Sequence, residues 1–110
     1  AEMAHTLVLQ EHERIGLSGM VVRINEDIAA YTFGYWLTSQ TWCILLEVAD
    51  RSIPGLAQWV FRETCRTAMA QGAVSINALD AAGLPGLRAA KLAYRPSAIL
   101  NTWMITRMTT

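Results

Sequence analysis

The sequence has few charged residues and no excess of either sign. Its 110 residues include 9 Lys and Arg and 9 Asp and Glu, so the formal net charge is zero. A neutral chain has no bulk attraction for nucleic acid or for an anionic membrane surface. Charged residues make up 16% of the chain, against about a quarter in an average soluble domain. We therefore expect any anion to be bound by a local cluster.

Long hydrophobic runs are also missing. No run approaches the roughly 20 apolar residues that a membrane-spanning helix needs. Residues 1–16 contain three Glu and two His, which is not the composition of a secretory signal. Both absences favour a cytoplasmic protein.

Patterns of metal ligands are scarce as well. Cys43 and Cys65 lack the spacing of a metal-binding pair and lie in apolar surroundings, so we expect buried free thiols. A disulfide or a nucleophile is the alternative. His5 and His12 would share a helix face, but no third ligand accompanies them, so we expect no metal.

Apolar residues are plentiful, at 53% of the chain, which excludes disorder and predicts one domain over residues 1–110. Such a composition predicts apolar surface that a second subunit, or a missing part of a longer protein, would cover. We expect a homodimer.

Hydrophobic periodicity and turn residues predict alternating helices and strands. The expected helices cover residues 2–15, 56–71 and 85–92, and the expected strands cover 19–24, 28–36, 42–49, 73–76 and 100–105. Residues 42–49 are nearly all apolar, which is typical of a central strand buried on both faces. Three antiparallel strands followed by a β-α-β crossover predict an α+β fold with a mixed sheet flanked by helices.

The loop at residues 50–55, Asp-Arg-Ser-Ile-Pro-Gly, has helix-start chemistry. We expect Ser52 to cap the next helix and Pro54 to lie in its first turn. The apolar stripe of that helix is expected to be Ala57, Phe61, Cys65 and Ala68.

Residues 77–96 place glycines and prolines around a short helix that carries Arg88 and Lys91. Residues three apart share a helix face, so both cations can point at one phosphate or carboxylate. The alternative is a pair of ordinary surface residues. Asp80 either caps this helix or pairs with one of the cations.

This order of elements resembles the GNAT acyltransferase fold. Within it, the chain resembles the family named for the C-terminal domain of phosphatidylglycerol lysyltransferase, from about residue 17 to 106. The resemblance is carried by Gly-Met-Val-Val-Arg at 19–23, Ile-Ala-Ala-Tyr-Thr-Phe-Gly at 28–34, Leu-Glu-Val-Ala-Asp at 46–50, and the pattern from Ile76-Asn77 through Asp80, Gly83-Leu84, Gly86-Leu87-Arg88, Lys91 and Tyr94 to Pro96. A full GNAT domain has a further strand and helix before the first three strands, so the resemblance implies a domain that is incomplete at its N-terminus.

The resemblance implies transfer of an acyl or aminoacyl group to an amine or hydroxyl, such as that of a small molecule or a lipid head group. The donor would be acetyl-CoA, another acyl-CoA or aminoacyl-tRNA. Arg51, Ser52 and Gly55 would bind the pyrophosphate of coenzyme A or the matching part of another donor, at the start of the next helix. Arg88 and Lys91 would bind an acceptor phosphate or the donor's tail.

Three residues are candidates for the chemistry. Glu47, in an apolar strand, is a candidate general base, with a salt bridge to Arg23 or Arg62 as the alternative. Asn77 would bind an acyl carbonyl or hold the following loop. Tyr94 would protonate a leaving thiolate or pack in the core.

Two functions from different classes are compatible with the sequence. The first is acyl or aminoacyl transfer, which the resemblance favours. The second is a non-catalytic GNAT-like remnant that acts as an oligomerisation or interaction module and binds no donor.

Overall fold

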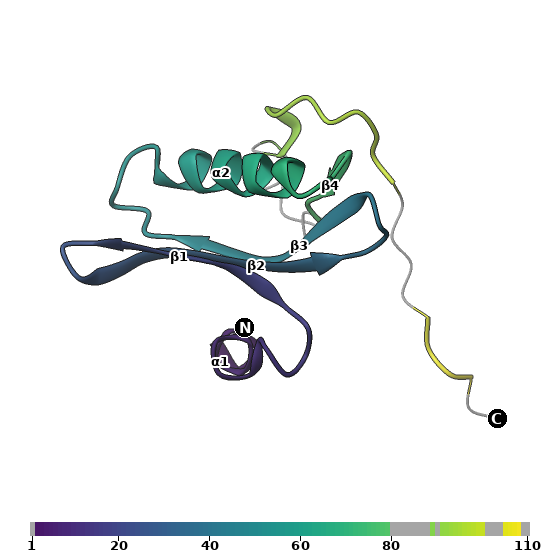
Figure 1. Ribbon diagram of the computed structural model, residues 1–110, viewed down its shortest axis with the longest axis horizontal. Helices are drawn as coiled ribbons and strands as arrows, with labels where there is room; N and C mark the ends of the chain where they lie inside the picture. Colours follow the sequence, from purple (N-terminus) through teal and green to yellow (C-terminus); the bar gives the residue numbers. More distant parts are fainter. Residues whose placement is uncertain (1, 80–88, 90, 101–104, 109–110) are drawn as a thin grey trace. The chain divides into compact units, whose positions relative to one another are not determined.

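The computed structural model describes residues 2–79, 89, 91–100 and 105–108 (Figure 1). The chain forms two compact units, residues 1–79 and 80–110, and each is described by itself. The elements of the first unit are α1 (Glu2–Glu11), β1 (Ser18–Ile24), β2 (Asp27–Trp36), β3 (Thr41–Ala49), α2 (Leu56–Ala70) and β4 (Ser75–Asn77).

The strands form one mixed sheet in the order β1-β2-β3-β4. β1 pairs with β2 and β2 with β3 in antiparallel register, whereas β4 runs parallel to β3 after the crossover through α2. The predicted mixed sheet and crossover are therefore confirmed. The β1–β2 turn has positive φ at Asn25 and Glu26, 52° and 74°, a conformation that matches the right-handed twist of the strands.

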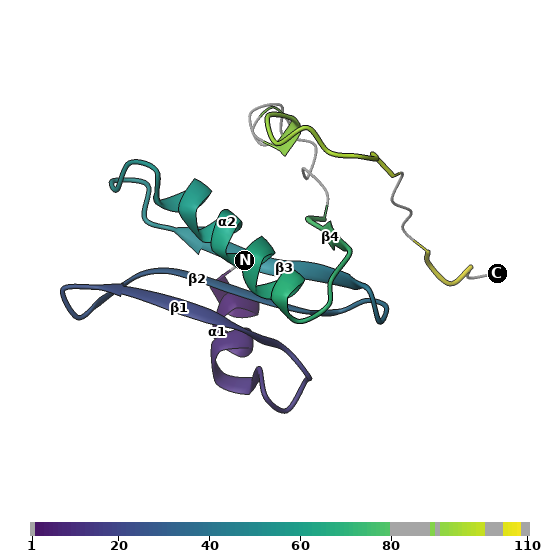
Figure 2. The ribbon, with the colours of Figure 1, turned by 45° about the horizontal axis from the view of Figure 1, so that its top comes forward.

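The two helices lie on opposite faces of the sheet, as Figures 1 and 2 show for the first unit. On one face, Val8 of α1 packs with Leu17 and Phe33. On the other face, α2 covers two apolar clusters. Leu56 and Val60 pack on small residues of β2 at one end, and Ala68 packs beside Trp42 at the other.

α1 is shorter than expected, because it ends at Glu11 and not near Gly16. Residues 12–16 form turns, and Gly16 has a φ of 76°. These turns bring the buried Leu17 back against Val8 of the helix, so packing of Leu17 accounts for the early end.

The buried stripe of α2 differs from the expected one. The buried residues, four apart, are Leu56, Val60, Thr64 and Ala68. Ala57 is exposed, and Phe61 and Cys65 are half-buried. The stripe is thus rotated by one residue, about 100° around the helix axis, over much of the helix.

β3 is buried on both faces only in its first half. Trp42, Cys43 and Ile44 are buried, whereas Leu45 and Val48 are 36% and 37% exposed. The expectation of burial on both faces is therefore wrong for the second half. β4 pairs only with the beginning of β3, so among the described residues the second half also has no strand on that side.

The sequence predicts a helix over 85–92 and a strand over 100–105, both within what forms the second unit. Ala89, Lys91 and Leu92 are helical, and the remaining residues of the expected helix 85–92 lie outside the described residues. Leu100 and Ile105, the ends of the expected strand 100–105, are not in a strand and are 76% and 93% exposed. No strand neighbour pairs with these two ends among the described residues, and positions 101–104 lie outside that part of the chain.

Candidate functional site

The sheet opens where β3 and β4 part. Their parallel pairing ends at Cys43 and Asn77. Residues 44–49 of β3 then continue with no strand on that side among the described residues. The Asn77 side chain accepts a hydrogen bond from the Leu79 N–H at 2.9 Å, and Leu79 has a φ of 59°. The chain thus leaves the sheet at Asn77, and among the described residues no strand pairs with this edge of β3 beyond Cys43.

A β-bulge directs Glu47 toward α2. Phe33 pairs with Leu46 and Gly34 with Ile44, so β3 carries Leu45 as one extra residue. An extra residue reverses the alternation of side chains beyond it. Glu47 consequently faces α2, as does Thr32, with which it pairs, and not α1.

Glu47 contacts a hydroxyl of α2. Thr64 Oγ1 lies 3.3 Å from Glu47 Oε1 and 2.8 Å from the Val60 carbonyl, and it can donate to either. Burial, and secondly the charge of Glu47, raise the pKa of the Cys65 thiol. The carboxylate therefore acts electrostatically between the sheet and the helix. Arg23 and Arg62, its expected alternative partners, are exposed.

Loop 50–55 connects β3 to α2 and is organised by Asp50. The Asp50 carboxylate accepts hydrogen bonds from the Ser52 hydroxyl at 2.7 Å and from the Ser52 N–H at 2.9 Å. These bonds, the hydroxyl bond first, lower the pKa of Asp50. The expectation that Ser52 caps α2 is wrong, because its side chain is bound to Asp50 and the helix begins only at Leu56. Pro54 likewise precedes the first turn.

Gly55 stands at the N-cap of α2 with a φ of 77° and no side-chain cap. The Leu56 N–H donates to Ile53 and the Trp59 N–H to Gly55 itself. Within the described part of the chain, the amides between them, at positions 57 and 58, have no acceptor. A helix start with free amides favours a negative group. A Cβ at Gly55 would meet nothing within 4 Å, so this surface is open.

The other predicted site residues fall into two groups. Arg51 is exposed in loop 50–55, near the free amides in sequence. Lys91 and Tyr94 lie in the second unit, where Lys91 is half-buried and Tyr94 is 47% exposed. Arg88 and Asp80 lie outside the described residues.

Sequence reasoning missed two hydroxyl groups beside Glu47. Thr64 is buried on α2, and Thr32 is buried on β2 directly opposite Glu47. The fourfold spacing of Leu56, Val60 and Thr64 is the signal that would have revealed one of them. For Thr32 the alternation along β2 places it on the α2 face, but only the bulge places Glu47 beside it.

No helix formed by the described residues is long and apolar enough to cross a bilayer. Across those same residues, His, Cys, Asp and Glu side chains nowhere gather in threes that could hold a metal ion. Both thiols are free, with Cys43 buried and Cys65 partly buried.

Several solved structures resemble the chain. A conserved protein of unknown function from Bacteroides thetaiotaomicron is 34% identical, with a TM-score of 0.77 over 86% of this chain and 31% of its own length. The chain thus spans about a third of that protein. A ribosomal-protein-alanine N-acetyltransferase from Brucella melitensis biovar Abortus is 10% identical, with a TM-score of 0.70 over 91% of this chain and 77% of its own.

An aminoglycoside N-acetyltransferase in complex with CoA is 11% identical, with a TM-score of 0.68 over 93% of this chain and 86% of its own. A comparison with curated proteins gives no match. These acetyltransferases confirm the predicted α+β fold of GNAT type.

The family model for the C-terminal region of phosphatidylglycerol lysyltransferase matches residues 2–106. That match covers nearly the whole chain and includes the strands, loop 50–55 and the motif from Asn77 to Pro96. The chain therefore belongs to the family of the phosphatidylglycerol lysyltransferase C-terminal domain.

Proposed function

We propose that the chain transfers an acyl or aminoacyl group to an amine or hydroxyl acceptor. One observation carries the proposal: the unpaired edge of β3, residues 44–49, leads directly into loop 50–55 and the free amides at the start of α2. The unpaired strand edge can form hydrogen bonds with an extended, amide-bearing chain. The free amides at the start of α2, which follow it directly, can bind a phosphate.

The donor would lie along this path. Its phosphates would accept hydrogen bonds from the amides of Ala57 and Gln58, with Gly55 allowing close approach and Arg51 supplying charge. Ser52 would hold the shape of the loop and would not bind the donor through its hydroxyl, because that hydroxyl donates to Asp50. An acyl-CoA such as acetyl-CoA fits this arrangement, and the similarity to an acetyltransferase in complex with CoA supports it. The family description supports an aminoacyl donor carried by tRNA instead.

The acceptor nitrogen or oxygen would attack the acyl carbonyl, forming a new C–N or C–O bond while the bond to the donor's sulfur or oxygen breaks. Glu47 would take the proton that the acceptor loses. Tyr94 lies in the second unit, and its proposed part, giving a proton to the leaving group, rests on the family motif. Asn77, at the end of β4, would donate from its amide nitrogen to the acyl carbonyl, because its Oδ1 already accepts from Leu79.

The acceptor class follows from the family, whose description names a lipid with a phosphate in its head group. Arg88 and Lys91 would bind that phosphate. Arg88 lies outside the described residues and Lys91 lies in the second unit, so this part of the proposal rests on the family motif.

Donor binding is tested by thermal unfolding with and without acetyl-CoA, and separately by direct binding of lysyl-tRNA. A ligand that binds only the folded protein at 100 times its dissociation constant adds about 2.7 kcal/mol of stability. Arg51→Ala should reduce the effect, whereas Arg14→Ala, a change of the same type in the turns after α1, should not. If neither donor binds, the proposal is refuted.

A second candidate is a strand-pairing module that forms a homodimer. Among the described strands β1 lies at the edge of the sheet, and Val21 and Ile24 on it are 42% and 40% exposed. A bare strand edge of this kind pairs readily with another strand. Light scattering of the wild type and of Val21→Lys tests it, and a monomer at all concentrations excludes it.

A further inference from the structure

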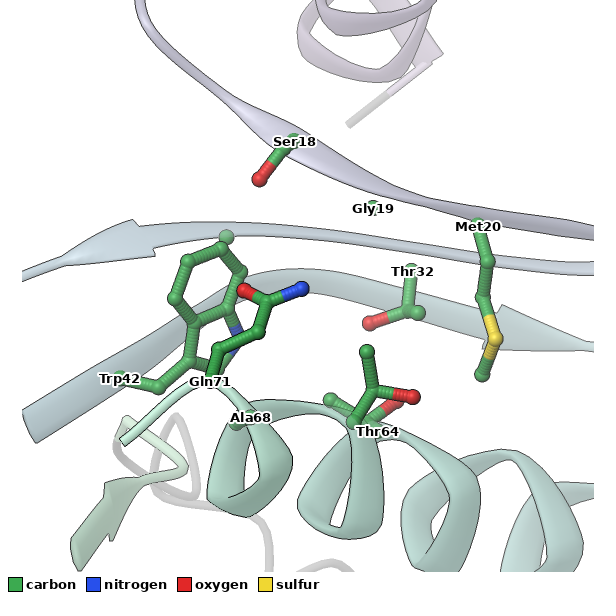
Figure 3. Close-up of a pocket in the computed structure, with 10 residues that line it drawn as sticks. Ser18, Gly19, Met20, Thr32, Trp42, Thr64, Ala68 and Gln71 are labelled. Atoms are coloured by element: carbon green, nitrogen blue, oxygen red, sulfur yellow. The ribbon is translucent and has the colours of Figure 1, made fainter. Parts of the chain in front are cut away.

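A pocket lies between the sheet and the second half of α2, away from loop 50–55 (Figure 3). Its volume is about 150 Å³. A cavity of about this volume holds a molecule the size of benzene, or about five waters at their liquid volume. The pocket therefore suits a ligand of roughly six non-hydrogen atoms.

The lining of the pocket is mostly apolar, carries no charge and presents several uncharged polar groups. Hydroxyl and amide side chains come from Ser18, Thr32, Thr64, Thr67 and Gln71, and the Trp42 indole forms an apolar wall. Neither Lys nor Arg lines the pocket, so nothing there balances an anion.

Thr32 supplies a hydroxyl that is buried but unused. The residue is 3% exposed and makes no side-chain hydrogen bond within the described part of the chain. No fully enclosed polar side-chain atom lacks a partner there, so the Thr32 hydroxyl remains reachable from the pocket. Figure 3 shows its oxygen turned toward the side of Trp42 and Gln71. A buried hydroxyl without a protein partner is a place for a ligand atom.

Glu47 is not one of the residues that line the pocket, but its carboxylate contacts the lining residue Thr64. It pairs with Thr32 across the two strands, and Thr64 on the pocket wall lies within hydrogen-bond distance of its carboxylate. A carboxylate behind a lining hydroxyl, in a pocket that also presents an indole ring, favours an ammonium group over a neutral or anionic one.

We propose that this pocket binds a small primary amine, with its ammonium group beside Thr32 and Thr64 and facing the Glu47 side. The binding of the amine is independent of the acyl transfer proposed above. Its role as the acceptor rests on that proposed function. The size of the pocket restricts the bound part to a short aminoalkyl end of a larger molecule or to a free small amine.

Ethanolamine is the probe, with ethylene glycol as a neutral analogue of the same size and glycolate as an anionic one. Binding is followed by NMR through the Trp42 indole N–H and the backbone amides of Thr32 and Thr64. We expect ethanolamine to shift these signals with a dissociation constant at least fivefold below that of ethylene glycol, and glycolate not to shift them. Equal effects of ethanolamine and ethylene glycol would overturn the proposal.

Two sets of variants test the pocket itself. Thr32→Val keeps the shape but removes the hydroxyl, and should weaken binding about fivefold, the worth of one hydrogen bond. Thr38→Val, the same change in the exposed β2–β3 turn, should leave it unchanged. Gln71→Glu and Gln71→Lys alter only an exposed rim residue, so folding is retained, and should strengthen and weaken binding respectively.

Unchanged affinity in Thr32→Val together with no opposite response of the two Gln71 variants would refute the site. Donor binding without amine binding overturns the pocket assignment and retains acyl transfer. Amine binding without donor binding retains the pocket and overturns acyl transfer.

Discussion

Gly55 and Gly16 form a matched pair for testing the donor site. They have φ angles of 77° and 76°, and at neither would a Cβ meet any atom within 4 Å. An alanine at either position therefore introduces no clash, and its cost comes only from the left-handed backbone. That cost is about 1–2 kcal/mol of unfolding free energy. In a domain of this size each kcal/mol lowers the melting temperature by about 4–8 °C.

Gly55→Ala and Gly16→Ala should therefore lose similar stability in urea unfolding. They should differ in donor binding, because only Gly55 borders the free amides at the start of α2. We expect Gly55→Ala to weaken acetyl-CoA or lysyl-tRNA binding and Gly16→Ala to leave it unchanged. Equal effects of the two variants on donor binding would refute the reasoning, because they would show that loop 50–55 has no special part in it.

Three further predictions follow from particular contacts. Val60→Ala should cost about 2 kcal/mol in urea unfolding, because Val60 is 0% exposed under the sheet, and a loss below about 0.5 kcal/mol would contradict this packing. Ser52→Ala removes the hydroxyl hydrogen bond that is the larger cause of the lowered Asp50 pKa, so an NMR titration should show a higher Asp50 pKa in the variant. The stability that the ionised Asp50 contributes is present above the usual carboxylate pKa and is lost as the pH falls through the lowered pKa. An unchanged Asp50 pKa in the variant would contradict the hydrogen bond. Glu47→Gln removes the secondary cause of the raised Cys65 pKa, so iodoacetamide at about pH 8 should alkylate Cys65 faster than in the wild type, and an unchanged rate would contradict the contact.

Much of the sheet could be predicted from sequence, because its signals are local. Alternating apolar residues on both sides of Asn25 and Glu26 indicate the first hairpin, and Gly72 marks the end of the crossover helix. The parallel pairing of β4 with β3 follows from the helix between them.

The geometry of the site could not be predicted in the same way. The direction of Glu47 depends on the extra residue Leu45, and that bulge is a property of the pairing between two strands and not of either sequence run. Ser52 has the composition of a helix cap, but Asp50 lies two residues before it and binds its hydroxyl. Side-chain competition of this kind is settled only by the folded loop.

The most direct test of the account is NMR mapping of the bound donor. Acetyl-CoA is titrated into one labelled sample and lysyl-tRNA into another. We expect at least one of them to shift the amides of Ala57 and Gln58 and those of residues 44–49, while the amides of β1 stay in place. Shifts from neither donor, or shifts that spare both the start of α2 and the open edge of β3, would contradict the central claim.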